Sequence, residues 1–370
     1  MHESVESIDL RLTARNESYG ALVWRRLRRS WSGMLGLILV GLLVTTSIFA
    51  DFVAPADPKA SDLAFAPPDS LGFTGAGGVW SLRPKTYPIG ETGEFDPVTF
   101  QPLTGPDFEH PHELGFFVQG YAYNLLWLIP STTHLFGSLD GAPIHLLGTD
   151  KFGRDILSRG IIGSRISLLI ALSVVTITTL VGTLVGITSG YLGGNFDIRL
   201  QRFVDLVLAF PQLPFYLALT SLIPVTAPSN VFIAFVISVL AALGWAQLSR
   251  EVRGKTLALA RVDYVRAAIA VGASDRRIIL QHILPNVMSH VIVAVTLAIP
   301  NVILLESFLG FLGFAVKPPL ISWGLLLQDT AAFSVIGSYP WILSPVGFVL
   351  VAVFAFNALG DGLRDAIDPY

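Results

Sequence analysis

The segment 263-DYVRAAIAVGASDRRIILQHILPN-286 decides the fold, because it is a basic, Ala-rich stretch placed between two long apolar runs. It carries three arginines and two aspartates, with one Gly and one Pro. The runs on either side, 230–248 and 287–309, are largely apolar. Such an interruption indicates a chain that leaves an apolar environment for water and then returns to it.

The composition of the whole chain identifies that environment as a membrane. Of the 370 residues, 52% are hydrophobic and 14% are charged, whereas soluble domains carry about 25% charged residues. The net charge of −3 does not favour a nucleic-acid partner. The chain has no cysteine, which excludes disulfides, thiolate metal sites and thiol nucleophiles.

Six apolar runs are long enough to cross a bilayer, for which a helix needs about 20 residues. They cover 33–53, 166–191, 204–225, 230–248, 287–309 and 340–359. The third run contains Pro211 and Pro214, which membrane helices tolerate where neighbouring helices satisfy the freed backbone groups. We therefore expect an all-α membrane protein with six transmembrane helices.

The positions of Lys and Arg predict the orientation, because cytoplasmic loops are enriched in these residues. A cytoplasmic N-terminus places one set of bases on the same side: Arg25, Arg26, Arg28, Arg29, Arg199, Arg202 and the arginines of 249–285. Both termini are therefore expected in the cytoplasm, with 54–165 and 310–338 outside. The expected units are a cytoplasmic segment (1–32), the first transmembrane helix (33–53), an extracytoplasmic loop (54–145) and a core with the other five helices (146–370).

A signal peptide is the alternative interpretation of the first apolar run, since arginines precede it and small residues such as Ala50 follow. The apolar part of a signal peptide usually has about 7–15 residues. The run 33–53 is longer and begins well inside the chain, so a retained helix is favoured.

The segment 54–145 interrupts the hydrophobic pattern with many Pro, Gly, acidic and aromatic residues. A long segment without strong periodicity is usually functional or loosely ordered, and its aromatic residues fit a small core or a sugar or peptide contact. His110 and His112 stand beside Glu109 and Glu113, a set that could hold a divalent ion, but no distant third ligand is identifiable and an ordinary exposed pair is favoured.

Catalytic signatures are missing from the sequence. Gly254-Lys255-Thr256 resembles the end of a phosphate-binding loop, but Ser249 stands where its first glycine belongs and no strand precedes it. No H-E-x-x-H or G-x-S-x-G motif occurs. An enzyme is therefore a poor interpretation of this chain.

Glu306 is the notable acid of the apolar runs, where a charged group costs about 2.5–3.5 kcal/mol near a helix centre. It falls near the outer end of the fifth run. It is either an interfacial acid in contact with water, or a residue that lines a path or supports an outer gate.

The quoted segment predicts a helix-turn-helix on the cytoplasmic surface. A first helix over 257–271 would break at Gly272, and Ser274 would cap a second helix with Asp275 in its first turn and Pro285 at its end. Small residues and arginines suit docking of another protein. An amphipathic hairpin lying on anionic lipid is the alternative.

Three motifs in this chain resemble those of one family. The quoted segment is similar to E-A-A-x3-G-x9-I-x-L-P, 147-LGTDKFGRDILSRGIIGSRISL-168 to L-G-T-D-x-x-G-R-D-x-x-S-R-x-x-x-G-x-R-x-S-L, and 357-NALGDGLRDAIDP-369 to N-x-x-G-D-x-L-R-D-x-x-D-P. These are signatures of binding-protein-dependent ABC importer permeases, in particular the C-type permease of the dipeptide, oligopeptide and nickel subgroup.

The resemblance implies a type I ABC importer permease-like fold and a set of partners. It implies a second homologous permease, two cytoplasmic ATPases and an extracytoplasmic solute-binding protein, in a bacterial-type inner membrane. It also implies that this chain binds no cofactor and that ATP and Mg lie on the ATPases. Solutes of such importers include peptides and some oligosaccharides.

The resemblance also assigns site residues. The coupling region 257–285 would contact an ATPase through Arg266, Ala267, Ala268, Gly272, Asp275, Leu284 and Pro285. Support of a gate or pore would fall to Glu306, Gly153, Arg154 and Asp155. Arg266 departs from the signature, which has Glu there, so we expect an ATPase surface of complementary charge; 54–145 is also longer than the usual external loop.

Other functional classes explain less of the sequence. A membrane receptor or scaffold that binds a cytoplasmic partner through 257–285 leaves the joint occurrence of three permease motifs unexplained. A membrane enzyme lacks a site.

Overall fold

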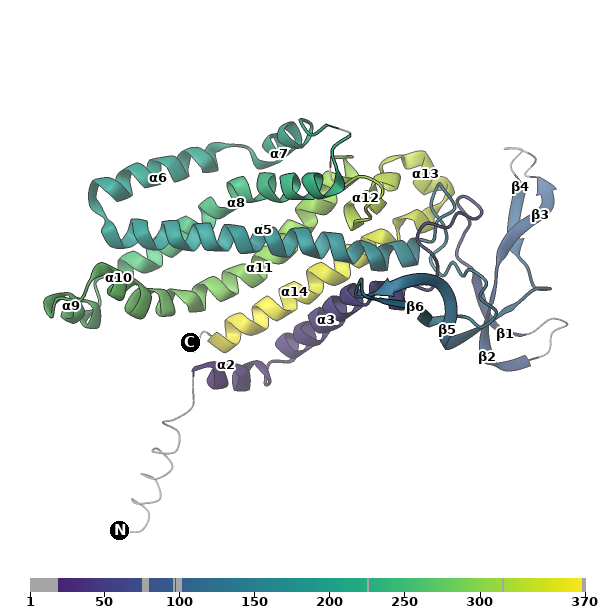
Figure 1. Cartoon of the computed structure of the whole chain (residues 1–370), viewed down its shortest axis with the longest axis horizontal. Coiled ribbons are helices and arrows are strands. Elements are labelled where there is room, and N and C mark those ends of the chain that lie inside the picture. The colour runs from purple at the N-terminus through teal and green to yellow at the C-terminus, as the bar shows by residue number, and fades with distance from the viewer. Residues whose placement is uncertain are drawn as a thin grey trace, which may run out of the picture.

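A computed structural model describes residues 19–74, 80–95, 97, 102–224, 226–314 and 316–367. Long helices lie side by side in one bundle, and a β region extends from one end of it (Figure 1). The short helices α9 and α10 lie at the opposite end of the bundle.

Five described helices are long and apolar enough to cross a membrane. They are α3 (Trp31–Ile48), α5 (Ile156–Leu192), α8 (Ser229–Leu259), α11 (Leu284–Phe311) and α14 (Pro345–Ile367). A sixth candidate is the pair α6 (Gly194–Ala209) and α7 (Gln212–Thr220), bent by 76° at a break that contains Pro211. The described residues thus contain five candidate spans, or six if this bent pair counts as one.

Several short elements connect the long helices. They are α2 (Tyr19–Leu27), α4 (Ala50–Val53), α9 (Asp263–Ala270), α10 (Asp275–Ile278), the π-helical turn η3 (Ile279–Ile283), α12 (Trp323–Leu327), η4 (Gln328–Ala331), α13 (Phe333–Ser338) and η5 (Pro340–Leu343). The helix that contains α11 is continuous from Asp275 to Phe311, because the π turn joins α10 to α11 without a break.

The expectation of an all-α protein is wrong for 54–145. Four strands form an antiparallel sheet in the order β1 (Ser70–Thr74), β2 (Trp80–Tyr87), β5 (His112–Leu125) and β6 (Ile129–Ser138). A separate hairpin pairs β3 (Ile89–Phe95) with β4 (Pro102–Pro106). The strands lack the alternation of apolar and polar residues that predicts a half-buried strand. In β5, for example, the neighbours Phe116 and Phe117 are both aromatic and both exposed.

Glycines allow the closest helix contacts. A Cβ on Gly182, Gly186 or Gly190 of α5 would lie 2.6–2.8 Å from an atom of α8. These three glycines recur at every fourth position, the small-residue spacing typical of packed membrane helices. A Cβ on Gly362 of α14 would lie 2.1 Å from Gly33 Cα of α3, so a glycine of the C-terminal motif lets the last helix pack against the first.

Candidate functional site

The predicted coupling region contains a knob, residues 262–283, formed by α9, α10 and η3. Apolar contacts on its buried side hold it in place. Val265 of α9, Ile278 and Ile283 are each at most 1% exposed. They pack in one cluster with Ile187 of α5 and with Val252 of α8, Val287 and Val291. The knob is therefore held by three long helices at once.

The outer face of the knob is exposed and carries both apolar and charged side chains. Val271 is 85% exposed and Ile269 is 50% exposed, and Val262 and Tyr264 are also exposed. Arg266 and Ala267 stand on the same short helix, both exposed. The guanidinium of Arg266 has no hydrogen bond or ion pair to another residue of the described chain, so it is available to a partner.

The turn between the two helices follows the prediction at Gly272 and differs from it elsewhere. Gly272 has φ +83°, a left-handed conformation that favours glycine. Ser274 lies at the start of α10, but its side chain makes no capping hydrogen bond, so that part of the prediction is wrong. Asp275 instead accepts a 2.8 Å hydrogen bond from the Tyr191 hydroxyl at the end of α5.

Two predicted helix boundaries in this region are also wrong. The predicted helix over 257–271 is divided, because α8 ends at Leu259 and α9 begins at Asp263. Pro285 does not end a helix: it follows the π turn η3 directly, within the helix that continues from Asp275 to Phe311. Ala268 and Leu284 are half-buried at the inner side of the knob, while Pro285 is exposed.

A bidentate ion pair lies near the knob, and sequence reasoning missed it. Arg253 of α8 donates two 2.6 Å hydrogen bonds to Asp197 of α6. Ser189 of α5 donates to the same carboxylate, and Gln201 donates to Ser189 Oγ at 2.8 Å. The ion pair therefore ties three helices together. Its two partners lie outside the predicted helices and 56 residues apart, so no sequence signal pointed to the pair.

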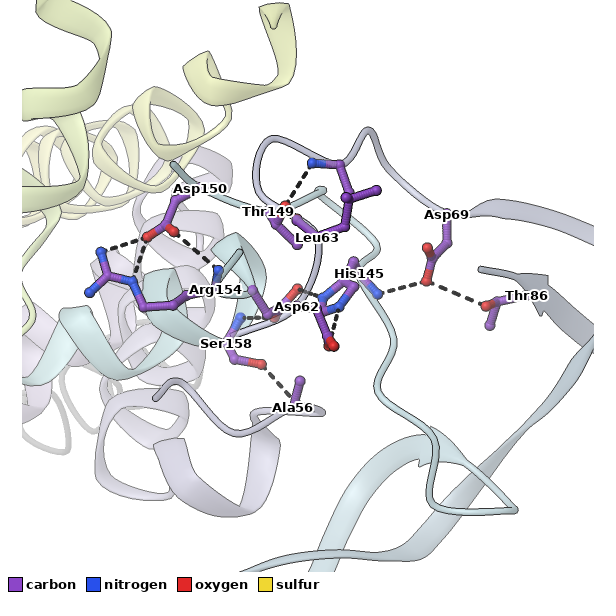
Figure 2. Close-up of polar contacts among 12 residues, drawn as sticks. Ala56, Asp62, Leu63, Asp69, Thr86, His145, Thr149, Asp150, Arg154 and Ser158 are labelled. Carbon is purple, nitrogen blue, oxygen red and sulfur yellow. Dashed lines mark hydrogen bonds and ion pairs between the residues drawn. The ribbon is translucent and has the colours of Figure 1, made fainter. Parts of the chain in front are cut away.

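At the other end of the bundle, 147–155 forms a platform on which the chain leaving α4 rests (Figure 2). Thr149 Oγ1 donates to the Leu63 carbonyl at 2.6 Å and accepts from Ala66 N at 2.8 Å. Asp62 N donates to the Gly153 carbonyl at 2.8 Å. Backbone and side-chain bonds together thus dock 62–69 on the motif.

Each of the three predicted residues in this platform has a distinct task. Gly153 has φ +74°, and a Cβ there would lie 2.0 Å from the Asp62 carbonyl oxygen. Arg154 pairs with Asp150 at 2.7 Å. Asp155 caps α5 by accepting a 2.6 Å hydrogen bond from Ser158 N, which satisfies one of the donors left free at a helix start.

His145 lies between Asp155 of the platform and Asp62 of the segment docked on it (Figure 2). Its Nδ1 lies 3.3 Å from Asp155 Oδ1, and its Nε2 lies 3.2 Å from Asp62 Oδ2. Burial lowers the pKa of His145, but the hydrogen bonds and charges of Asp155, Asp69 and Asp62 outweigh it, so the pKa is raised above 6.5. Asp69 accepts from His145 N at 2.7 Å, and burial raises the pKa of Asp69.

Glu306 is fully buried, so the expectation of an interfacial acid in contact with water is wrong. Ser167 of α5 donates a 3.1 Å hydrogen bond to Glu306 Oε2, and Ser167 Oγ also accepts from Trp323 N at 3.0 Å. A Cβ on Gly324 would lie 3.1 Å from Glu306 Oε1. Glu306 therefore joins α5, α11 and α12.

The remaining motif candidates are resolved by their surroundings. His110 pairs with Asp107 at 2.8 Å, whereas His112 pairs with Asp140 at 2.6 Å, so the two histidines face different carboxylates. Among the residues that the structure describes, no three His, Asp or Glu side chains gather as a metal-binding group. Gly254, Lys255 and Thr256 are helical residues of α8, which is not the conformation of a phosphate-binding loop.

The predicted site residues thus form separate groups. The helices α9 and α10 of the knob lie at one end of the bundle (Figure 1). Gly153, Arg154 and Asp155 directly precede α5, whose start lies at the other end beside the β region. Glu306 lies on α11, hydrogen-bonded to α5. The helix α5 runs between both ends, with Asp155 before its first residue and Tyr191 near its last.

Comparison with known proteins gives named relatives. The oligopeptide transport system permease protein OppC of Haemophilus influenzae is 44% identical over 226 residues, which cover 61% of this chain and 70% of the relative. OppC of Bacillus subtilis is 38% identical, covering 65% and 76%. The dipeptide transport system permease protein DppC of Bacillus subtilis is 36% identical, covering 61% and 68%.

A solved structure of the MetNI methionine ABC transporter, in an inward-facing conformation, aligns with 55% of this chain and 94% of its own at 14% identity and a TM-score of 0.39. The family model described as "N-terminal TM domain of oligopeptide transport permease C" matches residues 18–68. The model described as "Binding-protein-dependent transport system inner membrane component" matches residues 182–370. Since that match covers half of the chain, the chain belongs to the family of binding-protein-dependent transport system inner membrane components.

Proposed function

We propose that this chain is the transmembrane permease subunit of an ATP-driven importer for peptides, with oligosaccharides as the alternative class of solute. Membership of the family supports a role in transport. The printed names of relatives at 36–44% identity, which are oligopeptide and dipeptide permeases, support the peptide assignment.

The observation that supports the mechanism is the knob, because one of its faces is packed against the long helices and the other is exposed. Its buried face, with Val265, Ile278 and Ile283, packs against the ends of α5, α8 and α11. Its exposed face presents Val271 and Ile269 together with Arg266. A partner bound to this exposed face would displace the knob when it changes conformation. The buried contacts would then displace the ends of α5, α8 and α11.

The partner at the knob would be one of two cytoplasmic ATPases. The coupling contacts would come from Arg266, Ala267, Ala268, Gly272 and Asp275, with Leu284 and Pro285 at the base of the knob. ATP and Mg would bind to the ATPases, and this chain would contribute no catalytic site and no cofactor. A second homologous permease would complete the pore.

The proposed function implies an orientation in a bacterial-type inner membrane. The knob and both termini would lie in the cytoplasm. The β region would lie on the outer side, where a solute-binding protein would deliver the solute. The domain limits would then be 1–32, 33–53, 54–145 and 146–370, with coupling through 257–285.

The platform and Glu306 would support the outer gate. Gly153 binds the chain that connects α4 to the β region, while Arg154 braces the platform and Asp155 caps α5. Glu306 binds Ser167 of α5, which in turn binds α12. Their role would be to keep the outer ends of the helices in register while the pore changes its access.

Uptake of a labelled peptide tests this function. Cells that lack the chain should not accumulate a labelled tripeptide or pentapeptide, and cells with the restored chain should do so only with ATP. A labelled oligosaccharide serves as the competitor class. Accumulation of the oligosaccharide and not of either peptide would overturn the peptide assignment while leaving the transport role intact.

A further inference from the structure

The tip of the β5–β6 hairpin is unusually apolar for a turn outside a membrane. Leu125 pairs with Ile129, so the turn comprises residues 126–128, within the sequence 125-LLWLI-129. Leu128 is 83% exposed and Trp127 is 74% exposed. Hairpin turns in water usually carry Gly, Asn or Asp, so this tip suits a different solvent.

The backbone of the tip strengthens that argument. Leu126 has φ +51° and Trp127 has φ +61°, a left-handed conformation that bulky side chains rarely adopt and that Gly or Asn would adopt at less cost. Leu126 and Trp127 therefore occupy positions where Gly or Asn would be more favourable for the backbone. A local rule broken in this way points to a functional demand on the side chains.

Contacts of Trp127 place the tip beside the end of a membrane helix. The Arg165 guanidinium lies 5.2 Å from the centre of the Trp127 ring. The same guanidinium donates to the carbonyls of Ser47 at 2.9 Å and Ile48 at 3.0 Å, in the last turn of α3. Figure 1 shows one end of the β5–β6 hairpin next to this end of α3.

The body of the hairpin is held in that position by α4. The Phe52 and Phe117 rings lie 6.3 Å apart, and the Tyr121 hydroxyl donates to the Asp51 carbonyl at 3.4 Å. The hairpin is therefore fixed against the helix that directly follows α3, and Trp127 and Leu128 of its tip stay exposed.

Helix α3, whose last turn lies beside the tip, also exposes apolar residues. Along α3, Leu42 is 63% exposed and Ile48 is 44% exposed, as expected for a candidate span of which 17% is buried inside the protein. We propose that the tip, residues 126–129, inserts into the outer leaflet of the bilayer and anchors the β region to lipid. Tryptophan is typical of the membrane interface, where its ring is apolar and its N–H meets water.

The chain lends itself to a direct test, because it has no cysteine. Leu128→Cys places a single thiol at the tip, and Leu82→Cys on β2 is the matched control, since Leu82 is also a leucine that is 83% exposed. Each variant, with the subunits that co-purify with it, carries a nitroxide label in vesicles of phosphatidylethanolamine and phosphatidylglycerol. Collisions of the label with oxygen, which concentrates in lipid, and with a water-soluble nickel chelate are measured by electron paramagnetic resonance.

We expect the label at 128 to collide more with oxygen than with the nickel chelate, and the label at 82 to do the reverse. Equal nickel access at both positions would overturn the proposal by placing the tip in water. Low collision with both reagents at 128 would also overturn it, because a protein partner would then cover the tip. Since the measurement needs neither solute nor ATP, its failure is distinct from a failure of the transport function.

Discussion

Arg266 carries the largest departure from the family's signature, and it lies where a partner would reach it. It is exposed on α9, next to an apolar face that includes Ile269 and Val271. An arginine in place of the signature's glutamate inverts the charge at this position. The ATPase opposite should therefore present an acidic group.

Reversal of this charge should weaken coupling. Arg266→Glu would set like charges against each other at an interface, and each 1.4 kcal/mol of such cost is about a tenfold loss in affinity. We predict at least about a tenfold weaker association with the ATPase and a matching fall in ATP-driven uptake, with Arg266→Lys close to the parent. Unchanged uptake by Arg266→Glu would show that charge at this position is irrelevant to docking.

Gly153 is restricted in two ways, by its backbone and by its neighbour. Its φ is +74°, and an added Cβ would lie 2.0 Å from the Asp62 carbonyl oxygen. Gly193→Ala is the matched control, because Gly193 has φ +64° and nothing within 4 Å of its Cβ position.

Gly153→Ala should release the platform. A strained backbone costs about 1–3 kcal/mol, and the clash with Asp62 adds to that cost. We predict a lower thermal midpoint and faster proteolysis near 62–69 for Gly153→Ala than for Gly193→Ala. Equal midpoints for the two variants would mean that the close approach to Asp62 does not matter.

His145 makes the platform sensitive to pH. Its pKa is raised in the folded protein, so its contribution is complete below about 6.5, the ordinary value for histidine, and is lost as the pH rises through the folded pKa. We predict that resistance of 62–69 to proteolysis falls from pH 6 to pH 8. His145→Gln should remove this dependence; a slope that survives in the variant would assign it to another group.

At the scale of elements, the apolar runs predicted the helices well and their ends poorly. The fifth span was expected from 287, but the helix is continuous from Asp275. The second was expected from 166, but α5 begins at Ile156. Both extensions carry polar residues, so hydropathy could not detect them, and their packing in the protein stabilises them as helix.

The strands of 54–145 could not be predicted, for a different reason. Their stability comes from pairing between distant segments, such as Lys85 of β2 with Glu113 of β5. Lys85 and Glu113 also form a 3.1 Å ion pair. Such partners are fixed by register across the sheet, and a single sequence without clear alternation does not reveal them.

The crossing of α5 and α8 depends on glycine. A Cβ on Gly186 would lie 2.6 Å from the Ser249 carbonyl oxygen, and Ser249 is fully buried. Gly41→Leu in α3 is the matched control, because nothing lies within 4 Å of its Cβ position.

Gly186→Leu should separate the two helices. A side chain inserted into a tight contact costs about 1–3 kcal/mol or more, and it would also displace the Arg253–Asp197 pair nearby. We predict strongly reduced recovery of folded protein by gel filtration for Gly186→Leu and normal recovery for Gly41→Leu. Normal recovery of both would mean that the helices pack with more tolerance than this contact implies.

At the scale of the whole molecule, α5 links the two ends of the chain. With 37 residues, it is about 55 Å long at 1.5 Å per residue. Asp155 caps its first turn and contacts His145, while Tyr191 near its last residue binds Asp275 of the knob. In the proposed mechanism, a movement of the knob would reach the platform through this one continuous helix.

The overall arrangement was predictable because three motifs lie at structurally decisive places. The motif 147–168 contains the start of α5, and the motif 263–286 contains the knob. The motif 357–369 includes Gly362, which packs against Gly33. Ion pairs such as Arg253–Asp197 were not predictable, since their partners lie on different helices.

Co-purification tests the central claim, that this chain is a permease driven by separate ATPases, most directly. The chain would carry a C-terminal tag, be extracted gently from its native membrane, and its companions would be identified and quantified by mass spectrometry. We predict a second permease and two ATPase chains, or one ATPase at twice the amount of the tagged chain. Recovery of this chain alone, or with a signalling partner in place of ATPases, would contradict the account.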